Sequence, residues 1–316
     1  MSGEKKQTTV DLKNLKAGGF IKERGKDLFT VRLRVPGGRL PVERLKRITQ
    51  VAEKYGQGMV HLSVRQSVEL ININLKDFDA VVADLGEGDQ KVASCGARIR
   101  VPTACGGCEY NPNGLVDTQK SALEVDASLF GTDTGHHKFK VGFAGCPFDC
   151  PKSPTNDVGF QGSVLPRLEL DACIGCGLCA KSCTDGAIKM DENNKPVFTA
   201  ENCTFCGDCV KICPTEAWQA GKTGYMVRIG GKWGRRPLVG TLYARFLPEG
   251  EVVNFIAAVL EWYKKKAEGK GRVRIGDIIL QEGTASLLSA LRLKFPDYVV
   301  NDTIPPQIIE TQIGNR

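Results

Sequence analysis

The chain has 316 residues, of which 41% are hydrophobic and 25% are charged. This composition provides enough apolar surface for a sizeable core and excludes a disordered or fibrous protein. The 13 cysteines are an odd number, and 12 of them lie between Cys105 and Cys213, which favours bound metal over a secreted disulfide scaffold. The sequence shows no signal region and no apolar run long enough to span a membrane, so we expect a cytoplasmic protein.

The formal net charge of +7 is unevenly distributed. Residues 168–220 carry four lysines and eight acidic residues, a balance of −4, which leaves +11 for the rest of the chain. No recognition motif of aromatic and basic residues accompanies this charge, so we expect no nucleic-acid partner. An anionic cofactor or a small oxyanion substrate explains the basic remainder better.

The first 55 residues predict a strand followed by a helix. Residues 28–36 alternate apolar and polar side chains, which is typical of a half-buried strand. The sequence PGG follows as a turn. Pro41 suits the first position of a helix, and the apolar residues up to Gly56 are spaced along one helical face.

A second strand and helix pattern completes this N-terminal part. Residues 59–66 again alternate and predict a strand, with three apolar side chains on one face: Val60, Leu62 and Val64. Residues 69–73 continue as extended chain, and residues 78–85 predict another helix. The order strand, helix, strand, strand, helix favours an α+β layer.

Two cysteine runs with identical spacing mark an insertion in the chain. The spacing C-x2-C-x2-C-x3-C begins at Cys173 and repeats 30 residues later from Cys203. This is the bacterial ferredoxin pattern, in which the fourth cysteine of each run binds the other cluster. One 4Fe-4S cluster should therefore have the ligands Cys173, Cys176, Cys179 and Cys213, and the other Cys203, Cys206, Cys209 and Cys183. Two zinc sites would not require triplets with a crossed fourth ligand.

Four further cysteines come as two pairs and are enough for a third cluster: Cys105 and Cys108, and Cys146 and Cys150. The strand pattern before the second pair places Lys138 and Lys140 on one face, opposite Phe139, Val141 and Phe143. After the insertion, residues 224–237 predict a strand with a glycine-rich basic loop. Residues 252–263 predict an amphipathic helix.

At this point the sequence resembles a known family, the siroheme and 4Fe-4S sulfite and nitrite reductases. The segments that carry the resemblance are LRVPGGRLPVERL, SVRQSVEL, ARIRVPTAC, KFK, GCPFDC and NDVGFQG. The inserted cysteine runs make the chain most similar to the anaerobic and the small dissimilatory-type sulfite reductases.

The resemblance implies an α+β fold with a siroheme sulfite reductase core and an inserted bacterial-type dicluster ferredoxin domain. The core would consist of a ferredoxin-like half domain, residues 1–92, and a siroheme/4Fe-4S domain, residues 93–166 and 222–316. The inserted ferredoxin domain would occupy residues 167–221.

The resemblance also implies roles for individual residues. In the family a C-x3-C pair binds the core cluster and its second cysteine bridges to siroheme, which makes Cys150 the expected bridging ligand. The substrate cage of two arginines and two lysines corresponds to Arg65, Arg100, Lys138 and Lys140. Siroheme has eight carboxylates, and arginine pairs well with carboxylates; candidates for this binding are Arg32, Arg34, Lys232, Arg235 and Arg236.

The first cysteine pair departs from the family pattern. The usual spacing C-x5-C would place a second cysteine at position 111, which is Asn111 here, whereas an extra thiol occurs at Cys108. We therefore take Cys105 and Cys108 as the cluster ligands, because a C-x2-C pair can also chelate a cluster. Cys95 is a spare candidate ligand, and the simpler interpretation is a buried free cysteine.

The function that this resemblance implies is the six-electron reduction of sulfite to sulfide, with siroheme and three 4Fe-4S clusters as cofactors. The alternatives are nitrite reduction to ammonia with the same apparatus, an electron-transfer subunit without siroheme catalysis, and a siroheme-bearing regulatory subunit. The expected partners are sulfite or nitrite and an electron-donor protein, which could be a ferredoxin, an iron-sulfur subunit or a flavin subunit. Because the chain contains one half-domain pattern and the family's sites lie between two related halves, we expect at least a homodimer.

Overall fold

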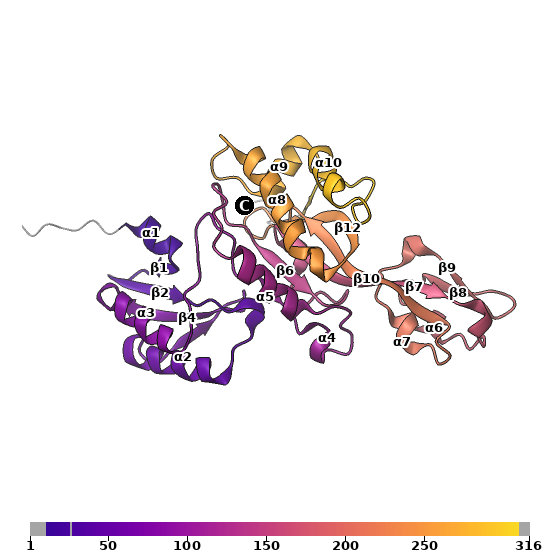
Figure 1. The fold of residues 1–316 in the computed structure, drawn as a ribbon, viewed down its shortest axis with the longest axis horizontal. Helices are drawn as coiled ribbons and strands as arrows, with labels where there is room; N and C mark the ends of the chain where they lie inside the picture. Colours follow the sequence, from indigo (N-terminus) through magenta and orange to yellow (C-terminus); the bar gives the residue numbers. More distant parts are fainter. Residues whose placement is uncertain (1–10, 26, 310–316) are drawn as a thin grey trace, which may run out of the picture.

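The computed structural model describes residues 11–25 and 27–309, so the ends of the expected domains, residues 1–10 and 310–316, lie outside the described residues. Three regions follow one another along the long axis of the molecule (Figure 1). An N-terminal sheet with its helices lies at one end, a larger central sheet lies in the middle, and a cysteine-rich arm lies at the other end.

The N-terminal region is an antiparallel sheet in the order β1-β2-β4-β3. Its strands are β1 (Phe20–Lys22), β2 (Leu28–Arg32), β3 (Val60–Leu62) and β4 (Val68–Asn74), and its helices are α1 (Leu12–Ala17), α2 (Val42–Tyr55) and α3 (Phe78–Glu87). The predicted alternation over residues 28–36 is confirmed, because Phe29, Val31, Leu33 and Val35 are all buried. They form one core with the apolar faces of α2 and α3.

The strand predicted over residues 59–66 is shorter in the structure, and its apolar face is exposed. β3 ends at Leu62, and Val60, Leu62 and Val64 have exposed fractions of 43%, 73% and 103%. Two physical reasons explain the difference. β3 is an edge strand whose apolar side chains no element of the chain covers among the described residues, and residues 63–67 leave the sheet in a turn in which Ser63 N donates to Ser67 O.

The central region is a five-stranded sheet in the order β12-β10-β7-β6-β5. Its strands are β5 (Thr103–Ala104), β6 (Val141–Ala144), β7 (Val158–Leu168), β10 (Trp218–Ile229) and β12 (Thr241–Leu247). Strands β5, β6 and β7 are parallel, whereas β10 pairs with β7 and with β12 in antiparallel fashion. A separate two-stranded ladder joins β11 (Leu238–Val239) to β13 (Gln307–Ile308).

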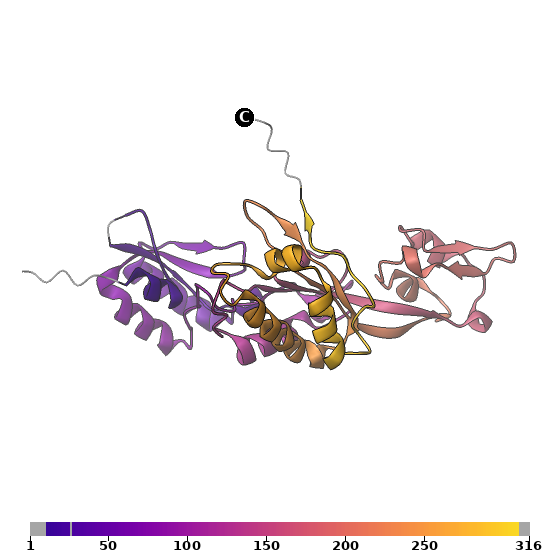
Figure 2. The same cartoon turned by 90° about the horizontal axis from the view of Figure 1, so that it is seen from above.

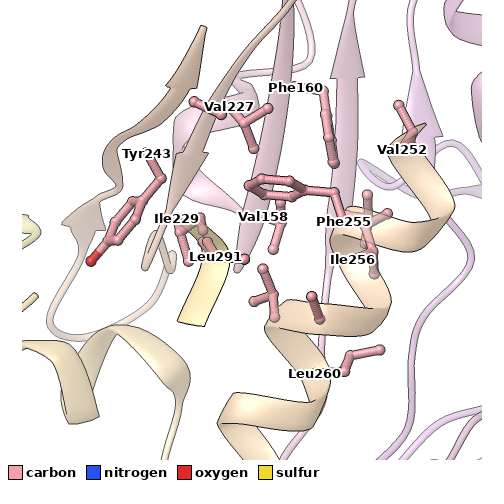
Figure 3. Packing of buried hydrophobic residues seen from close by; sticks show 14 of the residues in the cluster. Val158, Phe160, Val227, Ile229, Tyr243, Val252, Phe255, Ile256, Leu260 and Leu291 are labelled. Carbon is pink, nitrogen blue, oxygen red and sulfur yellow. The ribbon is translucent and has the colours of Figure 1, made fainter. Parts of the chain in front are cut away.

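Helices cover one face of the central sheet and form the main core with it. They are α5 (Thr118–Leu129), α8 (Val252–Ala267), α9 (Ile275–Glu282) and α10 (Ala285–Lys294). The short helix α4 (Gly107–Tyr110) follows β5 and carries Cys108. The helix predicted over residues 252–263 is confirmed as α8. Figure 3 shows Phe255 and Ile256 of α8 facing Val158 and Phe160 of β7, and all four side chains are fully buried. The opposite face of the sheet is thus the one left for the cysteine loops and the basic side chains.

The arm grows out of the central sheet as a long two-stranded ladder. β7 and β10 stay paired from Val158 and Ile229 as far as Leu168 and Trp218. The chain between them forms α6 (Leu178–Ser182), β8 (Ile188–Met190), β9 (Pro196–Phe198) and α7 (Asp208–Ile212). Seen from above, the arm projects away from the rest of the molecule (Figure 2), and it has a small core of its own around Trp218.

The molecule therefore has the α+β content that the sequence predicts. Among residues 11–25 and 27–309, no helix has both the length and the apolar character that crossing a bilayer requires.

Candidate active site and cluster sites

A basic pocket lies between the N-terminal region and the central sheet. Its volume is about 150 Å³, which suits a small oxyanion. The lining residues are Arg32, Arg65, Ser67, Ala93, Ser94, Arg100, Val101, Lys138 and Lys140. The structure thus brings together all four residues expected to form the substrate cage, and it adds Arg32.

The turn after β3 places Arg65 in this pocket. Arg65 Nη2 donates to Val101 O at 2.8 Å, and Nη1 lies 3.4 Å from Asn156 Oδ1. The next residue, Gln66, has a left-handed backbone (φ 58°) and exchanges two hydrogen bonds with the backbone of Ala104, at 2.7 and 2.8 Å. Because Ala104 precedes Cys105, this turn fixes the N-terminal region against the strand that leads to the cysteines.

Burial and mutual repulsion change the acidity of the cations in the pocket. Burial lowers the pKa of Arg65 to about 10, and the charges of Arg100 and Arg32 act in the same direction. Burial and the charges of Arg65, Arg274 and Lys138 together lower the pKa of Lys140 to about 8. Several cations that repel one another in a partly buried pocket are stabilised by a bound anion.

Cys95 contacts two arginines that line this pocket and does not lie among the other cysteines. It is 1% exposed, and its Sγ accepts hydrogen bonds from Arg100 Nη1 at 2.8 Å and from Arg32 Nη1 at 3.5 Å. Arg32 also pairs with the buried Glu69 at 2.6 Å, and Glu69 Oε2 lies 2.9 Å from His61 Nδ1. The thirteenth cysteine is therefore a neighbour of the cage residue Arg100 and of Arg32 beside the cage.

The other residues expected to bind siroheme carboxylates lie elsewhere. Arg34 donates to Asp126 at 2.8 and 2.9 Å and lies over the ring of Phe130. Lys232 forms an ion pair with Asp277 of α9. Arg235 and Arg236 are exposed in the loop before β11. Of the five candidates, the structure places only Arg32 beside the expected cage.

The sequence interpretation missed a buried ion pair beside Lys140. Arg274 Nε and Nη2 donate to the two carboxylate oxygens of Asp157 at 2.8 and 2.6 Å, and both residues are buried. Asp157 lies in the quoted motif NDVGFQG, but Arg274 precedes α9, 117 positions away in the chain. A short motif contains no signal for a partner at that separation.

Three of the core cysteines are neighbours. Cys105 Sγ accepts hydrogen bonds from Gly145 N at 3.0 Å and Gly107 N at 3.4 Å. Burial raises the pKa of Cys146, and the neighbouring thiols of Cys105 and Cys150 raise it further. Such a group of thiols fits a metal cluster, since bound iron stabilises the thiolate form.

Cys108 has different surroundings. It is exposed on the short helix α4. Burial of its sulfur raises its pKa, and the nearby carboxylates of Asp117 and Glu249 raise it further. Its assignment as the fourth core ligand stays a prediction.

The arm brings together one complete set of four cysteines. A cavity there is lined by Cys183, Cys203, Cys206 and Cys209, which is the crossed set that the spacing predicts. Burial, together with the neighbouring Cys206, Cys203 and Cys183, raises the pKa of Cys209 to about 12. Within the described part of the chain, no three metal-binding side chains come close enough to hold a single metal ion.

A hollow of about 240 Å³ separates this cysteine set from the core cysteines. Cys206 and Asp208 line it from the arm, and Cys146 and the exposed Phe148 line it from the core. A backbone hydrogen bond of 3.0 Å from Val164 N to Phe205 O holds the cysteine loop of the arm against β7. The second cysteine run therefore faces the core.

Unpartnered buried nitrogens test whether an anionic cofactor fits the open face of the central sheet. Among the described residues, Arg100 Nε and Arg228 Nη1 are buried without a hydrogen-bond partner. Arg228 lies on β10, within the electrostatic influence of Asp149 in the Cys146–Cys150 loop. Buried guanidinium nitrogens without partners are costly for an isolated chain, and a cofactor with several carboxylates would satisfy them.

Comparison with known protein families agrees with this arrangement. Residues 95–297 match the family described as "Nitrite and sulphite reductase 4Fe-4S domain", and residues 21–88 match "Nitrite/Sulfite reductase ferredoxin-like half domain". The chain belongs to the nitrite and sulfite reductase family. The resemblance inferred from the sequence motifs is confirmed.

Two of the individual relatives are named as sulfite reductases. It is 33% identical over 276 residues to the coenzyme F420-dependent sulfite reductase of Methanocaldococcus jannaschii, a match that covers 87% of this chain and 44% of that protein. It is 31% identical over 267 residues to a subunit of the anaerobic sulfite reductase of Salmonella typhimurium, covering 79% of this chain and 78% of that protein. The chain thus spans less than half the length of the first relative and about four fifths of the second.

A solved structure confirms the fold. The crystal structure of dissimilatory sulfite reductase I superposes with a TM-score of 0.69 and 21% sequence identity. The match covers 84% of this chain and 69% of that one. The core of the chain therefore has the sulfite and nitrite reductase fold.

Proposed function

We propose that the chain is a siroheme-dependent sulfite reductase that reduces sulfite to sulfide. The observation that carries the proposal is the basic pocket, where Arg65, Arg100, Lys138 and Lys140 line one cavity of oxyanion size. Similarity to two proteins named sulfite reductases supports sulfite as the substrate.

Siroheme bound through Cys150, together with a 4Fe-4S cluster at the core cysteines, would supply the electron-transfer chemistry. The chain itself supplies charge and protons. At neutral pH the guanidinium groups of Arg65 and Arg100 are positively charged, so they can hold the sulfite anion and offset its charge. Their fixed contacts to Val101 O and Cys95 Sγ orient these charges before substrate binds.

The lysines are the proton donors of the pocket in this proposal. Each of the three oxygens of sulfite leaves as water, so the six-electron reduction of hydrogen sulfite to hydrosulfide consumes six protons. The lowered pKa of about 8 means that Lys140 is mostly protonated at neutral pH and gives up its proton more readily than an ordinary lysine. Lys138, whose pKa is also lowered by burial, shares the same face.

We further propose that the arm is a dicluster ferredoxin domain, which gives the protein three 4Fe-4S clusters. The cavity lined by Cys183, Cys203, Cys206 and Cys209 supports this assignment, as does the crossed pattern of the spacing. Because this set faces the core across the hollow at Cys146, the remaining set is the outer one. The acidic arm is the expected docking site for an electron-donor protein.

Anaerobic purification followed by metal analysis and a visible spectrum tests the proposal. We expect siroheme bands, iron for three 4Fe-4S clusters plus the siroheme iron, and sulfide formation from sulfite with an artificial reductant. Iron for two clusters and no siroheme in folded protein would indicate an electron carrier instead. Faster turnover of nitrite than of sulfite would identify a nitrite reductase, and siroheme without turnover would indicate a regulatory subunit.

A further inference from the structure

The ion pair between Asp157 and Arg274 lies directly behind Lys140. Asp157 Oδ2 accepts a hydrogen bond from the backbone N–H of Lys140 at 2.7 Å as well as one from Arg274. Asp157 is 1% exposed and Arg274 is 6% exposed. The carboxylate therefore joins three elements: the chain entering β6, the start of β7 and the turn before α9.

This pair is an unusual choice if its role is only structural. Replacing a buried ion pair by apolar side chains of similar size is often neutral or stabilising. The same connection between β7 and α9 could be made by packing alone, as it is along α8. The position of the pair beside a cage lysine points to a role in the site.

We propose that Asp157 and Arg274 are positioning residues for Lys140: the carboxylate fixes the chain segment that carries the lysine, and the two opposite charges of the pair balance each other beside it. This inference rests on the proposed function, in which Lys140 donates protons to the substrate.

The charges around Lys140 give the sign of the expected effect. Burial lowers its pKa most, then the positive charges of Arg65, Arg274 and Lys138 lower it, and the negative charge of Asp157 raises it. Removing Arg274 should therefore raise the pKa of Lys140. Removing Asp157 should lower it further. The two partners of one ion pair are thus predicted to have opposite effects.

The pH dependence of sulfite reduction by the holoenzyme tests this inference. Lys140 must be protonated to act, so activity should decline as pH rises through about 8. In Arg274→Gln the decline should move to higher pH, and in Asp157→Asn it should move to lower pH. Shifts in the same direction, or no shift in either variant, would overturn the proposal.

Additional variants separate charge from position and guard against misfolding. The double variant Asp157→Asn/Arg274→Gln leaves no unpaired buried charge. The pH at which its activity declines should lie between the values for the two single variants. A value outside that interval counts against the proposal. Arg274→Lys keeps the charge but loses the two-pronged contact, so kcat should fall without a change in the pH of the decline. The matched control is Glu282→Gln, which removes exposed ion pairs with Lys266 and Lys270 at the other end of α9 and should leave the profile unchanged.

A second measurement does not depend on catalysis. Trace acetylation of the purified holoprotein with acetic anhydride at several pH values, followed by mass spectrometry, reports the acidity of the Lys140 amine directly. The pKa of Lys140 measured in this way should be higher in Arg274→Gln and lower in Asp157→Asn than in the unmodified protein. If these shifts appear and sulfite is not reduced, the proposed function fails while the role of the pair stands. If sulfite is reduced and no shift occurs, the pair is only structural.

Discussion

Cys95 is the residue whose surroundings differ most from those of the other cysteines. Its sulfur accepts hydrogen bonds from Arg100 and Arg32. In Cys95→Ala both guanidinium groups lose this acceptor. A hydrogen bond to a charged group is worth about 1.5–3 kcal/mol. If sulfite binding weakens by that free energy, the KM for sulfite should rise about tenfold or more.

Steady-state kinetics and iron analysis together check the prediction for Cys95. Iron and siroheme content should stay at the level of the unmodified protein, and Cys95→Ser, which retains an acceptor, should restore part of the affinity. Loss of iron in Cys95→Ala would show that this cysteine is a cluster ligand.

Arg228 gives a prediction about stability. Its buried Nη1 has no partner among the described residues, and such a group costs about 1–3 kcal/mol. In Arg228→Met we expect the apoprotein to melt at a higher temperature, whereas the protein expressed with siroheme should retain less of it. A lower melting temperature of the apo variant would contradict this and indicate a structural partner for Arg228.

At the scale of residues, the sequence predicts what short motifs contain. Arg65, Arg100, Lys138 and Lys140 each lie in a recognisable segment, and the structure collects them in one pocket. Arg274 could not be found in this way, because its role depends on contact with Asp157 after folding. Arg34 was expected near siroheme from its charge alone, yet Asp126 is its partner.

At the scale of elements, the crossed cysteine sets of the arm make a prediction that iron analysis can check. Cys183 lines a cavity with Cys203, Cys206 and Cys209. Two double variants should therefore differ in their iron content. Cys183→Ser/Cys206→Ser removes two ligands of the same cluster and should lose the iron of one cluster. Cys183→Ser/Cys176→Ser removes one ligand from each cluster and should lose the iron of two. If each run of four cysteines instead bound its own cluster, the first variant would lose the iron of two clusters and the second the iron of one. Iron per chain, measured with siroheme content as the internal reference, distinguishes the two patterns.

The alternation of apolar and polar residues predicted which side chains share a face of a strand, but not whether that face is buried. Alternation in residues 28–36 and in residues 59–66 is equally clear in the sequence. The first segment is an inner strand and is buried, whereas the second is the edge strand β3 and is exposed. The sequence pattern shows which side chains share a face, but what covers that face depends on the tertiary structure.

At the scale of the whole molecule, the cysteine spacing predicts an insertion between two parts of one domain. The structure shows how this insertion is attached: β7 and β10 continue past the central sheet as one ladder. The hollow between the cysteine sets and the turn at Gln66 depend on contacts between segments far apart in sequence. Such arrangements are not encoded in local composition.

The apolar edge strand leads to a prediction about assembly. Residues 21–88 match one half domain, and the apolar side chains of Leu62 in the edge strand β3 and of Val64 in the turn after it are exposed. Edge strands of this kind pair readily with another chain. We therefore expect a homodimer in which the β3 edges of two copies meet.

Light scattering on the purified protein should give twice the mass of the chain. Leu62→Lys combined with Val64→Lys should produce monomers, because burying two lysine charges in the contact is costly. Leu293→Lys is a matched control, since that side chain is 85% exposed on α10, in another region of the molecule, and it should leave the mass unchanged. A native protein that is monomeric and fully active would rule out the dimer, and with it the expectation that each site needs a second half domain.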